Sequence, residues 1–324
     1  IKNMKRVFGL TVLLISTYVF ELLFLYPGNI VDEVSYYEPT SQISVTNTTI
    51  YNKDIDHYYK IVKQLKEADF DSLDKSITRN DGDLIEDYSK SIELLISEIN
   101  INLLFHNFTK FRESNSGLKG IYVNGYYMNK ETKMNSIKEI LAKTNVNTLV
   151  IDAKTDNGHV LFDSQSSETD ILKNERIKYD AASLQELRKI KDLYLIARIV
   201  VFQDPLFAKT FKEEAIFDSK NNRIYSQNEQ YFLDPSSQRA RDYTLSLAIE
   251  ACQLGFNEIQ FDYIRYPDST YQYMVFKEKN NYLNRTNNIN SFLAEAKDRL
   301  HKEGCLVSAD IFGFILTNTE DGGI

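Results

Sequence analysis

The sequence predicts an α/β fold in which parallel strands alternate with amphipathic helices. From residue 119 onward, short apolar runs are followed by longer segments whose apolar residues recur at helical spacing. This alternation is typical of right-handed βα units around a parallel sheet. The expected strands span residues 120–124, 148–152, 193–201, 258–262 and 306–310, and the expected helices span residues 130–143, 181–191, 236–254 and 287–303.

Each expected strand carries a polar side chain near its C-terminal end. In a (β/α)8 barrel the active site lies at the C-terminal ends of the strands, where residues from several strands meet. In a doubly wound open sheet the ligand also binds at the carboxyl ends. Both topologies remain open on this pattern, and both predict a site at this edge of the sheet. The five residues are Asn124, Asp152, Arg198, Asp262 and Asp310.

The strand at 258–262 shows how such an end is built. At period two, Ile259 and Phe261 share one face and can pack on helices. Glu258, Gln260 and Asp262 share the opposite face, which must meet solvent or a reactive site. The alternative interpretation is an edge strand with a solvated polar face.

Two carboxylates on neighbouring strands suggest acid/base chemistry. Asp310 occupies the same face of its strand as Asp262 does on the preceding one. Adjacent strands lie about 4.8 Å apart, and retaining glycosidases use carboxyl groups about 5–5.5 Å apart. One carboxyl can then stay protonated as the acid while the other is ionised as the nucleophile.

Further candidates surround this pair. Arg198 and Arg265 can keep Asp262 ionised or bind a substrate oxygen, with a structural ion pair as the alternative for each. Tyr263 and Tyr266 are candidates to line a sugar cleft, with core packing as the alternative. Asp268, just beyond the same strand, completes the group.

Two earlier strand ends supply further substrate-binding candidates. Asn124 and Asp152 are assigned to substrate binding from their positions at the predicted rim. Asp152, Lys154 and Asp156 together fit a substrate or cation contact, and a solvated βα loop is the alternative.

The composition excludes several classes of protein. A net charge of −8 and a pI near 5.2 argue against general nucleic-acid binding. The four histidines form no HxH or HExxH pattern, so we expect no metal site and no cofactor. Cys252 and Cys305 form no CxxC pair and are expected to be two separate buried thiols.

The N-terminal region predicts export. The segment from Val7 to Leu25 is mostly apolar and follows Lys2, Lys5 and Arg6, as in a membrane-spanning or secretory segment. We expect residues 1–28 to be an uncleaved signal anchor, with a cleaved signal peptide as the alternative. Residues 29–116 are interpreted as a stalk and helical spacer, and residues 117–324 as the main domain. That domain is expected to be extracytoplasmic, attached to the cell membrane by a single pass or secreted.

The residues of this main domain resemble a known family, the glycoside hydrolases of the domain-of-unknown-function-4015 type (DUF4015), a branch of the TIM-barrel glycosidases. Several motifs in the same order carry the resemblance, which begins near Lys119. They are Lys119-Gly-Ile-Tyr-Val-Asn-Gly125, Leu149-Val-Ile-Asp-Ala-Lys154 with Asp156 and Gly158, Ile196-Ala-Arg-Ile-Val-Val-Phe202 with Asp204-Pro205, Phe232-Leu-Asp-Pro235, the stretch from Gly255 to Pro267, and Val307-Ser-Ala-Asp-Ile-Phe-Gly313.

The resemblance implies a TIM-type (β/α)8 barrel that acts on a glycan. It implies Asp262 as nucleophile and Asp310 as proton donor. Members of the family continue through three more βα units, so the barrel is expected to be truncated after about five. Such families often place a tryptophan before Leu233, where this chain has Phe232 and no tryptophan at all.

We therefore expect an extracytoplasmic glycoside hydrolase that cleaves a cell-envelope or extracellular polysaccharide by a retaining mechanism. One alternative is a non-catalytic glycan-binding or envelope-scaffolding module on the same barrel. Another is a barrel hydrolase that uses a carboxylate-bound cation.

Overall fold

The computed structural model describes residues 104–172, 178–179, 181–267, 271–279 and 281–311, together with Ser97, Ile101 and Asn102. The chain divides into two compact units at residues 60 and 61, and all described residues belong to the second. The predicted membrane segment at 7–25, the stalk and Asp268 lie outside the described residues. Among the helices that are described, none has the length and apolar character needed to cross a membrane.

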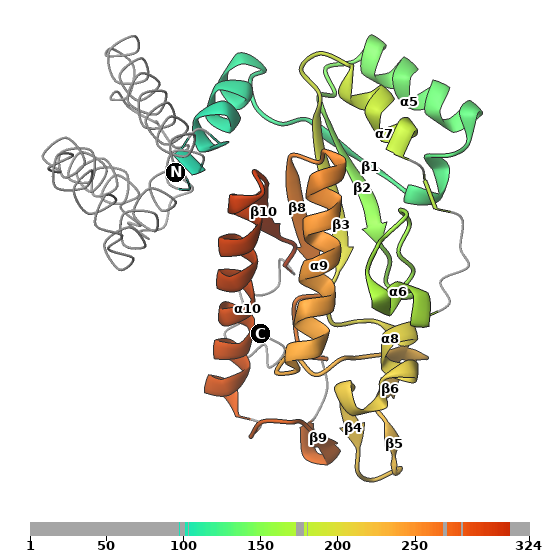
Figure 1. Ribbon diagram of the computed structural model, residues 1–324, viewed down its shortest axis with the longest axis vertical. Coiled ribbons are helices and arrows are strands. Elements are labelled where there is room, and N and C mark those ends of the chain that lie inside the picture. Colours follow the sequence, from blue (N-terminus) through green and yellow to red (C-terminus); the bar gives the residue numbers. More distant parts are fainter. Residues whose placement is uncertain are drawn as a thin grey trace, which may run out of the picture. The chain divides into compact units, whose positions relative to one another are not determined.

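Five parallel strands form the central sheet of the described part of the chain (Figure 1). Their spatial order is the order of the sequence, β1-β2-β3-β8-β10. The predicted parallel sheet is therefore confirmed. A doubly wound sheet would reverse its strand order at a switch point, and these five strands show no reversal. The strands are β1 (Gly120–Val123), β2 (Thr148–Lys154), β3 (Tyr194–Val200), β8 (Glu258–Asp262) and β10 (Leu306–Ala309).

The two faces of the sheet differ in the way that the period-two pattern predicts. On one face, residues such as Leu149, Ala197 and Ile259 are completely buried in the hydrophobic core. The opposite face carries Asp152, Arg198 and Asp262 near the strand ends. Asp152 pairs in register with Arg198 on β3, and Arg198 pairs with Gln260 on β8. The polar side chains therefore lie at similar heights on neighbouring strands.

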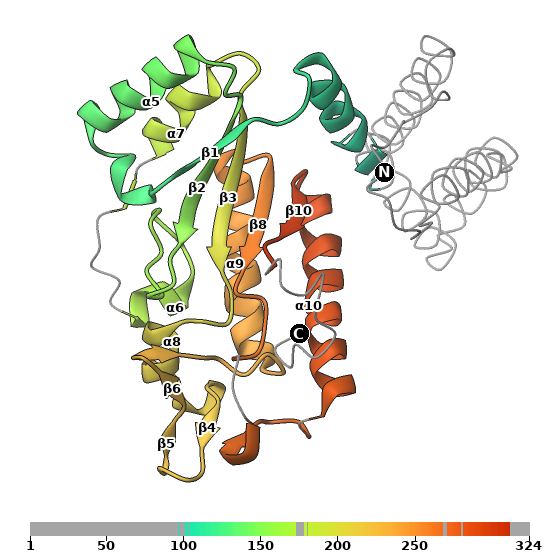
Figure 2. The same ribbon diagram turned by 180° about the vertical axis from the view of Figure 1, so that it is seen from behind.

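Among the described residues, four helices of eight residues or more connect these strands. The longest ones, α9 and α10, cover the same face of the sheet, as the two opposite views show (Figures 1 and 2). Ser237 caps the start of α9 by accepting a hydrogen bond from the Ala240 N–H. Gly255 ends α9 with a φ of 110°, which a residue without Cβ adopts readily. The four are α5 (Glu131–Lys143), α7 (Ala181–Arg188), α9 (Gln238–Leu254) and α10 (Tyr282–Lys302).

The long loops contain small elements that the sequence pattern did not predict. Asp204 caps α8 by accepting from the Phe207 N–H at 2.8 Å, and Pro205 is its first residue. A three-stranded antiparallel sheet joins the loop after β3 to the loop after β8, in the order β5-β4-β9. These elements are η1 (Gly125–Tyr127), α6 (Ser167–Ile171), α8 (Pro205–Thr210), η2 (Lys212–Glu214), β4 (Phe217–Asp218), β5 (Arg223–Ile224), β6 (Ser226–Gln227), β7 (Gln230–Tyr231), η3 (Tyr271–Tyr273) and β9 (Met274–Val275).

The two cysteines form a disulfide. The sulfur atoms of Cys252 and Cys305 are 2.03 Å apart, so the prediction of two separate thiols was wrong. Cys252 lies in the last turn of α9 and Cys305 directly precedes β10. Both residues are buried, and α10 returns the chain from one to the other. The bond closes a separation of 53 residues and joins the ends of two consecutive βα units.

A helical segment at 104–114 packs against the N-terminal end of β3. The rings of Phe108 and Phe111 lie 5.5 and 5.4 Å from the ring of Tyr194. Phe105 contacts His301 of α10 edge to face at 5.3 Å. The spacer that the sequence predicts up to residue 116 thus ends in a helix whose aromatic rings pack on Tyr194 of β3 and His301 of α10.

Candidate active site

The polar strand ends meet along one rim of the sheet. Because all five strands are parallel, their carboxyl ends lie at the same edge. Asp152, Arg198 and Asp262 lie on three consecutive strands of that edge, β2, β3 and β8. The structure therefore brings together side chains that are separated by more than one hundred residues in the sequence.

Arg198 binds two carboxylates at once. Its Nη1 donates to Asp152 Oδ1 at 2.8 Å, and its Nε donates to Asp262 Oδ2 at 2.9 Å. Nη2 also contacts Asp262 Oδ2, at 2.5 Å. Although burial disfavours its charge, the hydrogen bonds and negative charges of Asp152 and Asp262 raise the pKa of Arg198 further above its usual range. The planar guanidinium thus bridges the two carboxylates and fixes their spacing.

Tyr122 belongs to the same network and was not among the predicted site residues. Its hydroxyl donates to the second oxygen of Asp152, while the residue as a whole is 57% exposed. Burial of the hydroxyl and the neighbouring Asp152 charge raise the pKa of Tyr122 well above its usual range. Period two places Tyr122 on the same face of β1 as Asn124, and this pattern was the signal available from the sequence.

Asp262 also accepts a hydrogen bond from the backbone. The N–H of Tyr263 donates to Asp262 Oδ1 at 2.7 Å. Tyr263 has a φ of 51°, an uncommon left-handed conformation for an aromatic residue. The chain turns sharply there, and this turn aims the N–H at the carboxylate. Asp262 therefore has hydrogen-bond donors on both of its oxygens, and these donors fix its orientation.

Asp310 follows β10 beside Asp262. In the paired register, Ala309 lies opposite Phe261, so the next residues, Asp310 and Asp262, lie at the same height. The Asp310 N–H donates to the Phe261 carbonyl at 2.8 Å. Partial burial and the negative charge of Asp262 raise the pKa of Asp310, and Arg198 opposes that rise. The two carboxyl groups thus have different environments on adjacent strands.

The other predicted substrate-binding residues divide into two groups. The Asn124 side chain accepts from the Tyr126 N–H at 3.0 Å and caps η1. Tyr266 is 2% exposed, and its hydroxyl accepts from Asn288, while burial raises its pKa to about 12. These contacts favour capping and core packing over a substrate contact. Tyr263 and Arg265 are half-buried close to the rim.

Asp152 is buried at the rim, but Lys154 does not share its surroundings. Lys154 is completely buried and forms an ion pair with Asp204, so the alternative of a solvated loop is wrong for this residue.

No group of three or more His, Cys, Asp or Glu side chains is placed to hold a metal ion in the part of the chain that the structure describes.

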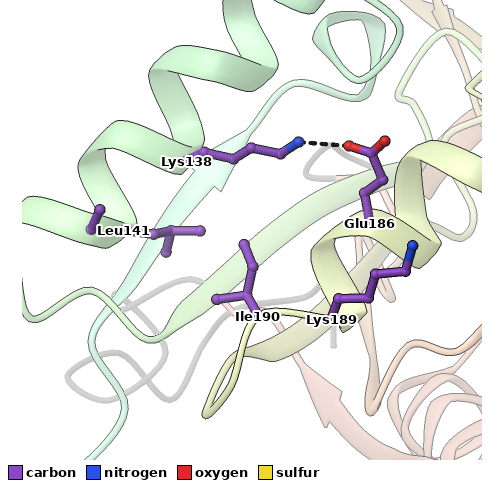
Figure 3. Close-up of a pocket in the computed structure, with 6 residues that line it drawn as sticks. Lys138, Leu141, Glu186, Lys189 and Ile190 are labelled. Atoms are coloured by element: carbon purple, nitrogen blue, oxygen red, sulfur yellow. Dashed lines mark hydrogen bonds and ion pairs between the residues drawn. The ribbon is translucent and has the colours of Figure 1, made fainter.

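A surface depression also lies between α5 and α7 (Figure 3). Leu141 and Ile190 line it, and Lys138 forms an ion pair across it with Glu186 at 2.6 Å. Both charged side chains are substantially exposed, and none of the rim carboxylates lines this depression. A second depression, between α6 and α9, is lined by residues such as Glu168 and Arg239. Neither contains the residues of the candidate site.

The chain is similar to several solved structures. A hypothetical protein from Ruminiclostridium thermocellum is 30% identical and covers 60% of this chain and 99% of its own, with a TM-score of 0.53. The α-L-fucosidase isoenzyme 2 from Paenibacillus thiaminolyticus is 16% identical over 59% of this chain and 32% of its own, with a TM-score of 0.39. Aspergillus fumigatus Ega3, in complex with galactosamine, is 14% identical over 62% of each chain, with a TM-score of 0.38. No curated protein matches the chain.

The family comparison covers the whole region that carries the rim. Residues 120–324 match the DUF4015 family, whose description is "putative glycosyl hydrolase domain". This range contains all five strands of the parallel sheet and every charged residue of the rim described above. The chain belongs to the DUF4015 family of glycosyl hydrolase-like domains.

Proposed function

We propose that the protein is a retaining glycoside hydrolase in which Asp262 is the nucleophile and Asp310 is the general acid/base. The observation that carries this proposal is the pairing of β8 with β10, which sets the two residues side by side at the rim. Neighbouring strands lie about 4.8 Å apart. That spacing is compatible with the roughly 5–5.5 Å between carboxyl groups that a double displacement requires.

The two carboxyl groups are suited to different roles. Arg198 and the Tyr263 N–H bind both oxygens of Asp262 and orient it for attack on an anomeric carbon. Partial burial and the adjacent Asp262 charge raise the pKa of Asp310, which favours the protonated form that a leaving oxygen needs. After glycosylation of Asp262, its negative charge is lost. Asp310 has given its proton to the leaving oxygen in that step, and without the neighbouring negative charge it stays ionised and can accept a proton from the attacking water.

The complete fold in this proposal is a (β/α)8 barrel. The uninterrupted order of five parallel strands and the position of the charged residues at their carboxyl ends support it. The face that carries Tyr122, Asp152 and Arg198 would then line the interior of the barrel. The exposed ring of Tyr122 supplies a flat apolar surface next to Asp152 on which a sugar can stack.

The proposed location is extracytoplasmic, with a cell-envelope or extracellular polysaccharide as substrate. The disulfide between Cys252 and Cys305 supports this location, because such bonds persist mainly in oxidising compartments. The apolar segment at 7–25, preceded by Lys and Arg, supports a membrane anchor or an export signal.

A second candidate function is glycan binding without turnover. One observation favours it: Arg198 places two nitrogens on Asp262 Oδ2, and the Tyr263 N–H occupies Oδ1. An oxygen with so many donors is a weaker nucleophile unless substrate binding displaces one of them.

The test compares sugar release with glycan binding. Purified full-length protein is assayed on a panel of polysaccharides and aryl glycosides, with Asp262→Asn and Asp310→Asn as variants. Asp298→Asn, an exposed aspartate on α10, is the matched control. The proposal predicts turnover by the wild type and control, and a loss of at least about 10³-fold in both rim variants. Glycan binding without sugar release by any of the proteins would favour the second function.

A further inference from the structure

The end of β2 contains a bulge that changes the direction of one lysine. Asp152 pairs with Arg198, and Lys154 pairs with Ile199, so Ala153 is one extra residue on β2. In a regular strand Lys154 would share the face of Asp152. Because it instead lies opposite Ile199, which belongs to the hydrophobic core, Lys154 points toward the helices.

Lys154 is completely buried there, and its ammonium group has specific partners. Nζ forms an ion pair with Asp204 Oδ2 at 2.8 Å and donates to the Val200 carbonyl at 2.7 Å. The ring of Tyr243, on α9, lies 5.9 Å from Nζ. One side chain therefore ties the end of β2 to the end of β3, which carries Arg198 two residues before Val200.

Asp204 extends this connection to the next helix. Its Oδ2 binds Lys154, while its Oδ1 accepts from the Phe207 N–H and caps α8. Gly158, in the hairpin that follows β2, lies against the same carboxylate with a φ of 81°. A Cβ at Gly158 would be only 2.1 Å from Asp204 Oδ1, so the loop approaches Asp204 as closely as a glycine allows.

This arrangement is not explained by stability alone. Replacing a buried ion pair by apolar residues of similar volume is often neutral or stabilising. A bulge next to a functional site commonly serves to redirect a side chain. Here the bulge removes a cation from the rim and keeps Asp152 opposite Arg198, which in turn holds Asp262.

We propose that Lys154 is a positioning residue: through its buried pair with Asp204 and its bond to Val200, it holds Asp152 and Arg198 in the geometry that orients Asp262. This inference rests on the proposed hydrolase function for its kinetic consequence. Its structural consequence, the restraint of Arg198, is independent of any substrate.

The test is the charge-neutral double variant Lys154→Met/Asp204→Asn. Asn keeps the cap of α8, and Met retains the length of the buried chain. Each single substitution leaves one charge buried without its partner, so both single variants should lose Tm, and the double variant should regain most of it. The matched control is Lys143→Met/Glu139→Gln, which removes an exposed pair from α5, with side chains 71% and 60% exposed.

Two measurements separate positioning from mere stability. In the double variant that regains its Tm, kcat should fall at least about tenfold, and KM should stay within twofold of the wild-type value. The reason is that loss of alignment acts on the transition state. In nuclear magnetic resonance, the Arg198 Nε–H should exchange with water faster than in the wild type. The control should match the wild type in both measurements.

A double variant that regains Tm and retains wild-type kcat and Arg198 exchange would overturn the proposal. If the wild type shows no turnover on any substrate, the proposed function fails, and the Arg198 exchange rate decides the positioning role by itself. If the double variant does not regain its Tm, Asp204→Glu carries the test. It keeps both charges but displaces the carboxylate by one methylene. Faster Arg198 exchange in that variant supports the proposal, and an unchanged rate contradicts it.

Discussion

Removal of the Arg198 guanidinium is the perturbation with the most distinctive expected result. Arg198→Met leaves Asp152 and Asp262 without their common cation. At an effective dielectric constant of about 20, each pair with charges about 4 Å apart contributes about 4 kcal/mol before desolvation. Loss of one partner from a buried pair typically costs about 3–5 kcal/mol.

The lower end of that range applies here. Arg198 is 19% exposed and Asp262 is 17% exposed, and Tyr122 still donates to Asp152. We expect the free energy of unfolding to fall by about 3 kcal/mol, which lowers Tm by roughly 6–12 °C for a domain of this size. Arg239→Met is the control, because Arg239 is 39% exposed and its ion pair with Glu213 is 3.6 Å long. It should change the unfolding free energy by about 0.5 kcal/mol or less.

The same variant should change the pH dependence of turnover. Arg198 opposes the rise of the Asp310 pKa, so its loss raises that pKa further. A general acid with a higher pKa remains protonated to higher pH, and the basic limb of the kcat/KM profile should therefore move to higher pH. The assay is a pH profile of wild type and variant on the same substrate. A basic limb that stays in place or moves to lower pH would refute the assignment of Asp310 as the acid and of Arg198 as its electrostatic neighbour.

Three other perturbations have defined outcomes. Removal of the disulfide by Cys252→Ser/Cys305→Ser should lower the free energy of unfolding by about 4 kcal/mol, because the bond closes a separation of 53 residues. Urea unfolding measures this change, and a change below about 1 kcal/mol would contradict the structural role of the bond. Asp310→Asn should increase stability at neutral pH. The folded-state pKa of Asp310 is raised above its unfolded value, so the wild type loses stability as pH rises from about 4 through that pKa. Thermal unfolding at pH 3 and pH 7 measures this loss. The loss should be smaller in the variant, which has no carboxyl group at this position. Phe108→Ala/Phe111→Ala should lower Tm by about 5 °C or more because both rings pack on Tyr194 of β3, and an unchanged Tm would contradict a stabilising role for the helix at 104–114.

Much of the sheet could be predicted because period-two patterns and βα alternation are local properties of the sequence. The strand that ends at Asp262 was predicted with the bounds observed, and the parallel order then placed Asp310 next to it. The contact between Arg198 and Asp262 follows from the same register. These residues were found because charged side chains at strand ends are conspicuous in an apolar sequence.

Other features depend on geometry that no short pattern contains. The bulge at Ala153 reverses the direction of Lys154 and hides a cation that a regular strand would place at the rim. Tyr122 was missed because an aromatic residue in an apolar strand looks like core until its hydroxyl is seen on Asp152. The disulfide requires α10 to return the chain so that Cys305 meets Cys252, and a separation of 53 residues does not indicate this.

The most direct test of the central claim is the identification of the residue that becomes covalently attached to substrate. The protein is incubated with a 2-deoxy-2-fluoro glycoside of a sugar that it releases, digested, and its peptides are analysed by mass spectrometry. The account predicts a glycosyl adduct on Asp262 that is absent from Asp262→Asn and still present in the Asp298→Asn control. Turnover without an adduct and with inverted product, or an adduct on Asp310, would contradict it.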